Sequence, residues 1–185
     1  MKLLFASDIH GSLKAAQQLI ERFKEEKADY LVLLGDLMYH GPRNPLPEGH
    51  DPQGVATLLN QYCHQIISVR GNCDAEVDQM LLQFRCLADE AWILADGYRF
   101  YLTHGHLNTV EDCALGQNDI YVHGHFHIPV LERRGDVIVM NPNSVALPKE
   151  GIAGYAIYEN HELSLRSLTD GSQIATLQLT GDRTC

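Results

Sequence analysis

Two short hydrophobic runs, one on each side of an amphipathic pattern, begin the sequence. Lys2–Ala6 and Tyr30–Leu34 have the length of strands and are almost wholly apolar. Between them, apolar residues recur at the spacing of one helix face, at Leu13, Ala16, Leu19, Ile20 and Phe23. Ser12 directly precedes this pattern and is a residue type that caps helix N-termini. The order strand, helix, strand predicts a βαβ unit with a buried parallel pair of strands.

The following segment predicts a long loop, two more helices and a third strand. Residues 38–52 are rich in proline and glycine, which predicts an irregular loop. Loops of this length in compact domains are often functional. We expect helices over 53–63 and around 75–83, and a strand over 65–69.

The second half of the chain has the pattern of antiparallel hairpins. Asp96-Gly97 separates apolar runs at 91–95 and 99–103, which is a strong signal for a two-residue hairpin turn. Further strands are expected at 119–122, 130–133, 137–140, 155–158, 163–167 and 174–179. Parallel units followed by hairpins predict an α/β fold with two sheets, or one large mixed sheet, and helices on the outer faces. We see no linker or repeat and expect one domain over residues 1–185.

Length and charge narrow the class of protein. The chain has 185 residues, of which 45% are hydrophobic and 21% charged, as in folded globular domains. Its 14 Lys and Arg against 24 Asp and Glu give a formal net charge of −10, which disfavours polymeric nucleic acid as a partner. Half of the 10 histidines lie between His104 and His127, which points to a metal site instead.

Membrane and disulfide signals are weak in this sequence. No hydrophobic run approaches the ~20 residues that span a membrane, and the N-terminus lacks the apolar stretch of a signal peptide. We therefore expect a cytoplasmic protein with no membrane partner. The cysteines are odd in number, widely spaced and without a CxxC pair, so we expect free thiols. They are Cys63, Cys73, Cys86, Cys113 and Cys185.

Five hydrophobic runs end in residues that can bind metal ions. The blocks are Asp8-Ile9-His10, Gly35-Asp36, Gly71-Asn72-Cys73-Asp74, Thr103-His104-Gly105-His106 and Gly124-His125-Phe126-His127. Each block alone is compatible with an ordinary turn or surface. Because ligands bind beyond the carboxyl ends of parallel strands, all five would converge on one edge if their strands share a sheet.

The donors in these blocks are carboxylate and amide oxygens and imidazole nitrogens. Six or more such ligands exceed the need of one tetrahedral ion and suit two ions that share a carboxylate. Abundant imidazole favours Mn²⁺, Fe²⁺ or Zn²⁺ over Mg²⁺. We expect two divalent ions, with Mn²⁺ the first choice.

In this order, the blocks resemble the calcineurin-like metallophosphoesterase superfamily. Its pattern is D-x-H, GD, GN followed by H or C and then D or E, a lone H, and GHxH. The loop His40–Gly49 and the segment Asp74–Met80 are similar to those of a group of bacterial phosphodiesterases in this superfamily. The resemblance implies a fold of two packed mixed β-sheets flanked by helices.

The resemblance also implies roles for individual residues. One ion would be held by Asp8, His10, Asp36 and His127, and the other by Asp36, Asn72, His104 and His125, with Asp36 bridging. A metal-bridging hydroxide would then attack the phosphorus of a small phosphodiester. Asp36, Asn72, Cys73 and Asp74 would belong to the catalytic centre.

Three positions depart from the family pattern. Cys73 stands where many members have a histidine that assists the transition state or protonates the leaving oxygen. Since cysteine is a weaker hydrogen-bond donor, Cys73 is either an acid or a buried structural thiol, and His106 is an alternative acid. Phe126 replaces a small residue, and Asn143 stands in the Asn141–Ser144 turn where the family has glycine; asparagine tolerates positive φ.

Substrate contacts and competing functions complete the expectations. Arg43 and Arg70 are candidates to bind a phosphate, because arginine suits its bidentate geometry, and His40 could line the pocket. A phosphomonoesterase or protein phosphatase is an alternative, since two metals serve these reactions too. A non-catalytic scaffold resembling the retromer subunit VPS29 is disfavoured, because every ligand position is filled by a competent residue. Exposed hairpin edges leave a homo-oligomer open.

Overall fold

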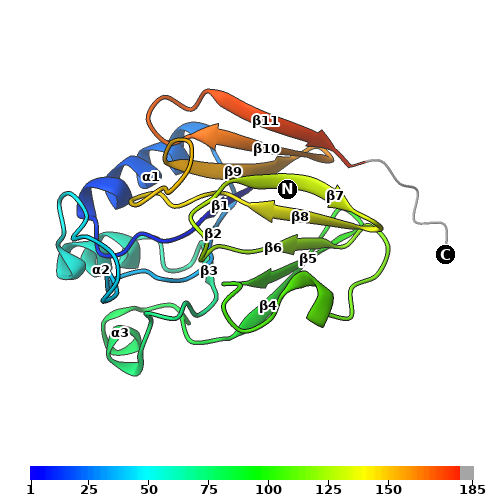
Figure 1. Ribbon diagram of the computed structural model, residues 1–185. Helices are drawn as coiled ribbons and strands as arrows, with labels where there is room; N and C mark the ends of the chain where they lie inside the picture. Colours follow the sequence, from blue (N-terminus) through cyan, green and yellow to red (C-terminus); the bar gives the residue numbers. More distant parts are fainter. Residues whose placement is uncertain (180–185) are drawn as a thin grey trace.

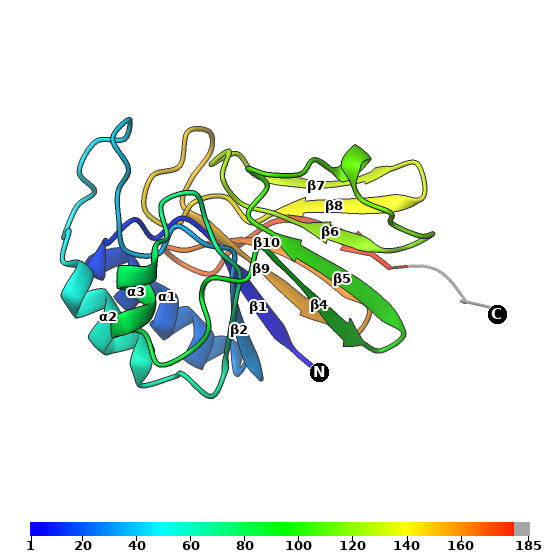
Figure 2. The ribbon, with the colours of Figure 1, turned by 90° about the horizontal axis from the view of Figure 1, so that it is seen from below.

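Two mixed β-sheets pack face to face in the computed structural model, which describes residues 1–179 (Figures 1 and 2). The six-stranded sheet consists, in spatial order, of β11 (Gln173–Gln178), β10 (Glu162–Ser167), β9 (Gly154–Glu159), β1 (Leu3–Ala6), β2 (Tyr30–Leu33) and β3 (Ile66–Ser68). The five-stranded sheet consists of β4 (Glu90–Ala95), β5 (Tyr98–Thr103), β6 (Ile120–Val122), β8 (Val137–Asn141) and β7 (Val130–Arg134). The expected pair of packed mixed sheets is confirmed.

Each sheet has a parallel centre and antiparallel edges. β1, β2 and β3 are parallel, which confirms the predicted βαβ unit, and β5, β6 and β8 form the parallel part of the other sheet. The hairpins β4–β5, β7–β8 and β9–β10 form where the turn signals predicted them, with ends that differ by one or two residues.

Within residues 1–179, the helices cover one of the two sheets, whereas the sequence pattern predicts helices on both outer faces. α1 (Leu13–Glu26) and α2 (Pro52–Asn60) pack on the outer face of the six-stranded sheet, and Ser12 Oγ caps α1 by accepting from Ala15 N at 3.2 Å. α3 (Glu76–Leu81) follows beside α2, where Asn60 Nδ2 donates to Leu81 O at 2.8 Å. The five-stranded sheet is instead covered by the β5–β6 loop, which contains a 3₁₀ turn, η1 (Val110–Asp112), that the sequence pattern did not predict.

Three apolar layers result from this arrangement. The central layer lies between the sheets and includes Phe5, Phe100 and Met140, all fully buried. A second layer lies under the helices. The third is a small cluster of Tyr101, Tyr121 and Val139 under the β5–β6 loop. The central layer therefore holds the two sheets together, and with them the turns at their common end.

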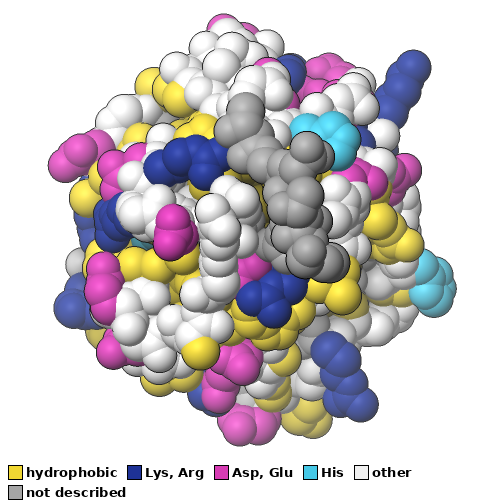
Figure 3. Space-filling model, turned by 90° about the vertical axis from the view of Figure 1, so that its right-hand side faces the viewer, with side chains coloured by type: hydrophobic (Ala, Val, Ile, Leu, Met, Phe, Trp, Pro, Cys, Tyr) yellow, Lys and Arg dark blue, Asp and Glu magenta, His cyan; other side chains and the backbone are white. Residues whose placement is uncertain are grey.

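The surface carries charges of both signs. On the side shown in Figure 3, acidic and basic side chains are interspersed rather than gathered by sign. No helix within residues 1–179 combines the length and hydropathy needed to cross a membrane. Cys63, Cys73, Cys86 and Cys113 are free thiols, whereas Cys185 lies outside the described residues. The prediction of one domain over the whole chain stays a prediction.

Candidate dinuclear metal site

The predicted metal-binding residues come from both sheets and meet where the sheets join. Asp8 and His10 follow β1, Asp36 follows β2 and Asn72 follows β3 of the six-stranded sheet. His104 follows β5, and His125 and His127 follow β6 of the five-stranded sheet. The simplest argument from the sequence required all these strands to lie in one sheet, whereas they belong to two. The residues converge because the parallel strands of both sheets end on the same side.

Three histidines are held in one tautomer by backbone carbonyls. The Nδ1 atoms of His10, His104 and His127 lie 2.9, 2.6 and 2.6 Å from the carbonyl oxygens of Tyr39, Leu34 and Leu147. A carbonyl can only accept, so each Nδ1 carries the proton and donates it. Each Nε2 thereby faces the cluster, where it donates to a carboxylate when protonated and offers a lone pair to a metal ion once deprotonated, the arrangement usual for metal-binding histidines.

The three Nε2 atoms point at two buried carboxylates. His127 Nε2 lies 3.1 Å from Asp8 Oδ1 and 3.2 Å from His10 Nε2. His10 Nε2 lies 3.7 Å from Asp36 Oδ2, and His104 Nε2 lies 3.5 Å from the same oxygen. Asp36 is thus between two imidazoles that come from different sheets.

The donor atoms fall into overlapping groups that fit divalent ions. Three groups have donors within 4.8 Å of one another: Asp8, His10 and His127; Asp8, Asp36 and His104; and His10, Asp36 and Cys73. Asp8, His10 and Asp36 each belong to two of these groups, and the group of Asp8, Asp36 and His104 shares one carboxylate with each of the other two. Two carboxylates with imidazole nitrogens, all buried, form a donor set that Mn²⁺, Fe²⁺ and Zn²⁺ prefer once the imidazoles are deprotonated.

Asn72 and His125 lie at the outer side of this cluster. Asn72 Oδ1 is 3.2 Å from His104 Nε2, so the amide oxygen faces the same space as the imidazole. The ring of His125 lies 5.1 Å from the ring of His104, and its backbone N–H donates to Asp8 Oδ2 at 3.1 Å. Both residues are therefore placed beside the donor groups rather than inside them.

The electrostatics of the cluster favour positive charge. Burial by itself would raise the pKa of Asp8, but hydrogen bonds from His10 and His127 hold the pKa well below its ordinary value. Burial opposes a charge on His104, yet Asp36 and Asp8 raise its pKa to about 9. The pKa of His125, farther from the carboxylates, falls to about 4 through burial and the nearby His104. The cations expected here would satisfy this local demand for positive charge.

The backbone at these residues is strained. Asp8, His10, Asp36, His125 and His127 have φ values of 59°, 50°, 55°, 65° and 58°, in the left-handed region. Residues other than glycine rarely adopt this conformation, because it costs about 1–2 kcal/mol of conformational free energy per residue. Such strain concentrates at functional sites, where the surrounding packing enforces it. The sequence pattern held no sign of it at these positions.

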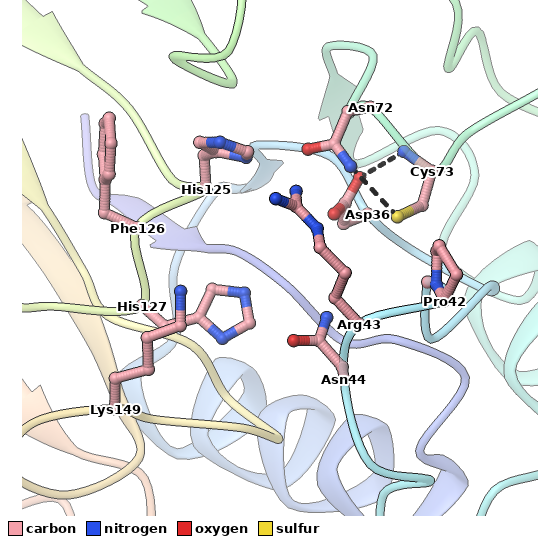
Figure 4. A pocket seen from close by; sticks show the side chains of 11 residues that line it. Asp36, Pro42, Arg43, Asn44, Asn72, Cys73, His125, Phe126, His127 and Lys149 are labelled. Atoms are coloured by element: carbon pink, nitrogen blue, oxygen red, sulfur yellow. Dashed lines mark hydrogen bonds between the residues drawn. The ribbon is translucent and has the colours of Figure 1, made fainter.

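A cavity of about 280 Å³ opens over the cluster (Figure 4). Asp36, Asn72, His125 and His127 line it on the metal side. Arg43 comes from the proline-rich loop and points into the cavity, and its contact with a phosphate stays a prediction. Asn44 and Lys149 also line it, and sequence reasoning missed both. Asn44 is a neighbour of Arg43 in the same loop and could have been considered, whereas nothing in the sequence marks Lys149.

Two other predicted substrate contacts lie away from this cavity. The His40 ring packs against the rings of Tyr39 and His50, at 4.9 and 5.4 Å, and does not line the cavity. Arg70 pairs with Asp89 at 2.6 Å. Their predicted contact with a phosphate stays a prediction.

Comparison with known proteins agrees with this geometry. Residues 1–162 match the model of the calcineurin-like phosphoesterase superfamily domain. The chain belongs to the calcineurin-like phosphoesterase superfamily. It is 51% identical, over 97% of this chain and 98% of the relative, to the phosphodiesterase YfcE of Escherichia coli strain K12. A solved structure of YfcE, a phosphoesterase from E. coli, superposes with a TM-score of 0.95 at 50% identity, and the match covers 97% of this chain and 100% of that chain.

More distant relatives share the fold. Wild-type Vps29 from Entamoeba histolytica, crystallised with Zn²⁺, has a TM-score of 0.62 at 17% identity, covering 97% of this chain and 100% of that one. At this identity, the likeness concerns the fold alone. The resemblance drawn from the five sequence blocks is confirmed at the level of the superfamily and of its YfcE-like members.

Cys73 and Asp74 of the family's third block have different surroundings. Cys73 lines the cavity, and its N–H donates to Asp36 Oδ1 at 2.8 Å. Burial and the Asp36 carboxylate raise the pKa of the Cys73 thiol far above its usual range, so it stays protonated. Asp74 does not line the cavity; its carboxylate accepts from the N–H groups of Asp36, Leu37 and Gly71 at 2.7–2.9 Å.

Asn143 and Phe126 also depart from the family pattern, the first within a turn and the second at the rim of the cavity. Asn143 has φ of 75°, so asparagine takes the left-handed conformation expected of the family's glycine. Its side chain also donates to Glu150 O and Ile152 O, which anchors the loop that carries Lys149. Phe126 is 48% exposed and stands at the rim of the cavity. The ring of His106 lies 5.3 Å from that of His104 and outside the cavity lining.

Proposed function

We propose that this chain is a phosphodiesterase that acts on small phosphodiesters with two divalent ions, Mn²⁺ first and Fe²⁺ or Zn²⁺ as alternatives. The observation that carries the proposal is the convergence of three Nε2 atoms on two buried carboxylates, with each ring oriented by a backbone carbonyl at its Nδ1. The identity to a relative named as a phosphodiesterase supports the same reaction.

The residues divide into two ligand sets. Asp8, His10, Asp36 and His127 would hold one ion, and Asp36, Asn72, His104 and His125 the other. The position of Asp36 Oδ2 between His10 and His104 supports its bridging role. When bound, the ions would supply Lewis acidity that polarises a phosphoryl oxygen and activates water.

The protein contributes positioning and charge around the phosphate. Arg43 and Lys149 line the cavity from opposite loops, and their charges would attract a phosphodiester anion and offset the negative charge that develops during hydrolysis. The amide of Asn44, beside Arg43, could donate to a phosphate oxygen. The net charge of −10 of the whole chain favours a small substrate in this cavity over polymeric nucleic acid, and we place the reaction in the cytoplasm.

The proton for the leaving oxygen has two candidate sources. Cys73 lines the cavity as a protonated thiol, while His106 lies behind His104 and outside the lining. We therefore favour Cys73. Cys73→Ala should lower kcat for an alkyl diester, whose leaving group needs a proton, about tenfold more than for a nitrophenyl diester. A selective loss of this kind in His106→Ala instead would assign the proton to His106.

Removal of the bridging carboxylate tests the whole proposal. Asp36→Asn should lose at least one equivalent of bound metal and about 10³-fold in kcat for an aryl diester, because the shared ligand and its charge disappear. Asp136→Asn, in the exposed β7–β8 turn, is the matched control and should keep both. Full metal content and activity in Asp36→Asn would contradict the dinuclear site.

The substrate class requires a second measurement. Wild-type enzyme loaded with Mn²⁺ should have a higher kcat/KM for an aryl diester than for the corresponding monoester. A higher value for the monoester would favour a phosphomonoesterase or a protein phosphatase. Bound metal without hydrolysis of either ester would favour a scaffold with this fold.

A further inference from the structure

A second cavity lies beside the first, on the outer face of the five-stranded sheet. Its volume is about 330 Å³, and it opens between the sheet and the β5–β6 loop. Its lining is mostly apolar and includes Val110 of η1, Tyr121 of β6, Val130 of β7 and Val139 of β8. Phe126 lines both this cavity and the one over the metal cluster.

The segment after β6 divides its side chains between the two cavities. His125 and His127 line the first cavity, and His123 and Ile128 line the second. The centroid of the Phe126 ring lies 5.1 Å from that of His125 and 5.7 Å from that of His123. Phe126, about half exposed, therefore lies between the cavity over the metal cluster and an apolar space.

The two cavities also differ in charge. Arg43 and Lys149 give the first cavity two cationic side chains. The second has one side chain of each sign at its edge, Glu111 and Arg134, and Arg134 is paired with Glu132 at 2.6 Å. The second cavity therefore suits an uncharged group, and its volume lies at the lower end of the range of small-molecule sites.

We propose that the second cavity binds one ester group of the substrate, namely an aromatic or similarly flat apolar group, while the phosphate lies in the first. This inference rests on the proposed phosphodiesterase function. A diester carries two organic groups on one phosphate, and Phe126 would provide a face for the group that stays attached when the other leaves. A small residue, as is common at this position in the family, would leave no such wall.

The test compares diesters that share a leaving group. Phenyl 4-nitrophenyl phosphate and methyl 4-nitrophenyl phosphate differ only in the group that is retained. Wild-type enzyme should favour the phenyl diester in kcat/KM by roughly tenfold, since a ring buried in the cavity leaves water. Val130→Phe, which fills the cavity, and Phe126→Ala, which removes the wall, should each bring this ratio close to one.

A matched control separates filling of the cavity from general disturbance of the sheet. Val137→Phe makes the same change on the same sheet face, but Val137 does not line the cavity. This variant should keep the wild-type ratio. Equal kcat/KM for the two diesters in the wild type, or an unchanged ratio in both Val130→Phe and Phe126→Ala, would overturn the inference.

A binding measurement tests the cavity without any hydrolysis. Benzyl(methyl)phosphinate has the single negative charge of a phosphodiester. Two P–C bonds replace its two ester bonds, so the compound cannot be hydrolysed. When it is added to protein loaded with Zn²⁺, the methyl NMR signals of Val110, Val130 and Val139 should shift, and dimethylphosphinate should leave them in place. Failure of the benzyl compound to shift these signals while it binds would overturn the inference even if diesters are hydrolysed, and loss of hydrolysis alone would concern only the proposed function.

Discussion

The turns that carry the metal cluster and the turns that close the hairpins use the same rare backbone conformation for different reasons. In the β4–β5 and β9–β10 hairpins, positive φ occurs at consecutive residues, Asp96-Gly97 and Asn160-His161. This is the pattern of a two-residue turn whose twist matches that of its strands. A Cβ built on Gly97 meets nothing within 4 Å, so the turn is open on the glycine side.

The turns of the cluster are enclosed by other segments. Asp8 N donates to Gly35 O at 3.1 Å, and His10 N donates to Asp36 O at 2.9 Å, so the turns after β1 and β2 hold each other. A Cβ on Gly124 would overlap Ser7 Oγ, which shows how closely the turn after β6 approaches the turn after β1. The positive φ values here are therefore imposed by tertiary contacts, and their cost is balanced by packing elsewhere.

The largest expected effect tests this enclosure directly. A Cβ on Gly71 would overlap both the backbone N and Oδ1 of Asp36. Gly71→Ala should lower the free energy of unfolding by about 4 kcal/mol, because the backbone itself must move, and should abolish metal uptake. Urea denaturation and metal analysis of the purified variant provide the measurement.

The comparison variant is Gly97→Ala in the β4–β5 hairpin. Only its φ of 84° opposes alanine, so we expect a loss of about 1 kcal/mol and unchanged metal content. Similar losses of stability in the two variants would mean that the cluster turns are no more enclosed than the hairpins.

The second largest expected effect concerns two aspartates that accept hydrogen bonds from turn backbones, one beside the metal cluster and one in an exposed turn. Asp74 is buried and accepts from three backbone N–H groups, including that of Asp36. Asp74→Ala leaves those groups without an acceptor and should cost about 3 kcal/mol, together with weaker metal binding. Asp170, which accepts from Ser172 N in an exposed turn, is the control, and Asp170→Ala should cost less than about 0.5 kcal/mol.

Activity measurements sharpen the assignment of Asp74. A positioning residue should affect the metal dissociation constant more than kcat at saturating metal. If Asp74→Ala retains full metal affinity but loses kcat at saturating metal, Asp74 acts on the reaction itself and is not a positioning residue.

The same contrast explains what could be predicted from the sequence. The hairpins were predictable because Asp96-Gly97 determines its turn locally. The βαβ unit was predictable because the periodicity of α1 and the apolar runs of β1 and β2 are local patterns too. The helix-free outer face of the five-stranded sheet and the η1 turn were not, because they depend on how the β5–β6 loop packs.

The candidate site was only partly visible in the sequence for the same reason. The five blocks marked the residues that converge, since metal-binding side chains at strand ends form a recognisable pattern. Lys149 was missed because its place in the cavity depends on the anchoring of its loop by Asn143. His40 was expected in the cavity because its loop contributes to it, but its ring packs on Tyr39 and His50 instead.

The smallest expected effect is at Asn143, where local and tertiary causes coincide. Asn143→Gly relieves the strain of φ at 75°, but it removes the acceptor for Ser144 N and the donors to Glu150 O and Ile152 O. Since three such hydrogen bonds contribute about 1 kcal/mol net each and the relief of strain returns about 1 kcal/mol, we expect a loss of about 2 kcal/mol in unfolding free energy. KM for a diester should rise a few fold as Lys149 loses its position, with kcat unchanged.

Asn160→Gly in the β9–β10 hairpin is the counterpart of this variant. Asn160 has φ of 51°, and within residues 1–179 its side chain makes no hydrogen bond that would be lost. Glycine should therefore be neutral or slightly stabilising at this position. Opposite signs of the two changes in stability would show that asparagine is retained at 143 for its side-chain contacts and at 160 for its backbone. A stabilising Asn143→Gly with unchanged KM would remove the proposed link between this turn and the phosphate cavity.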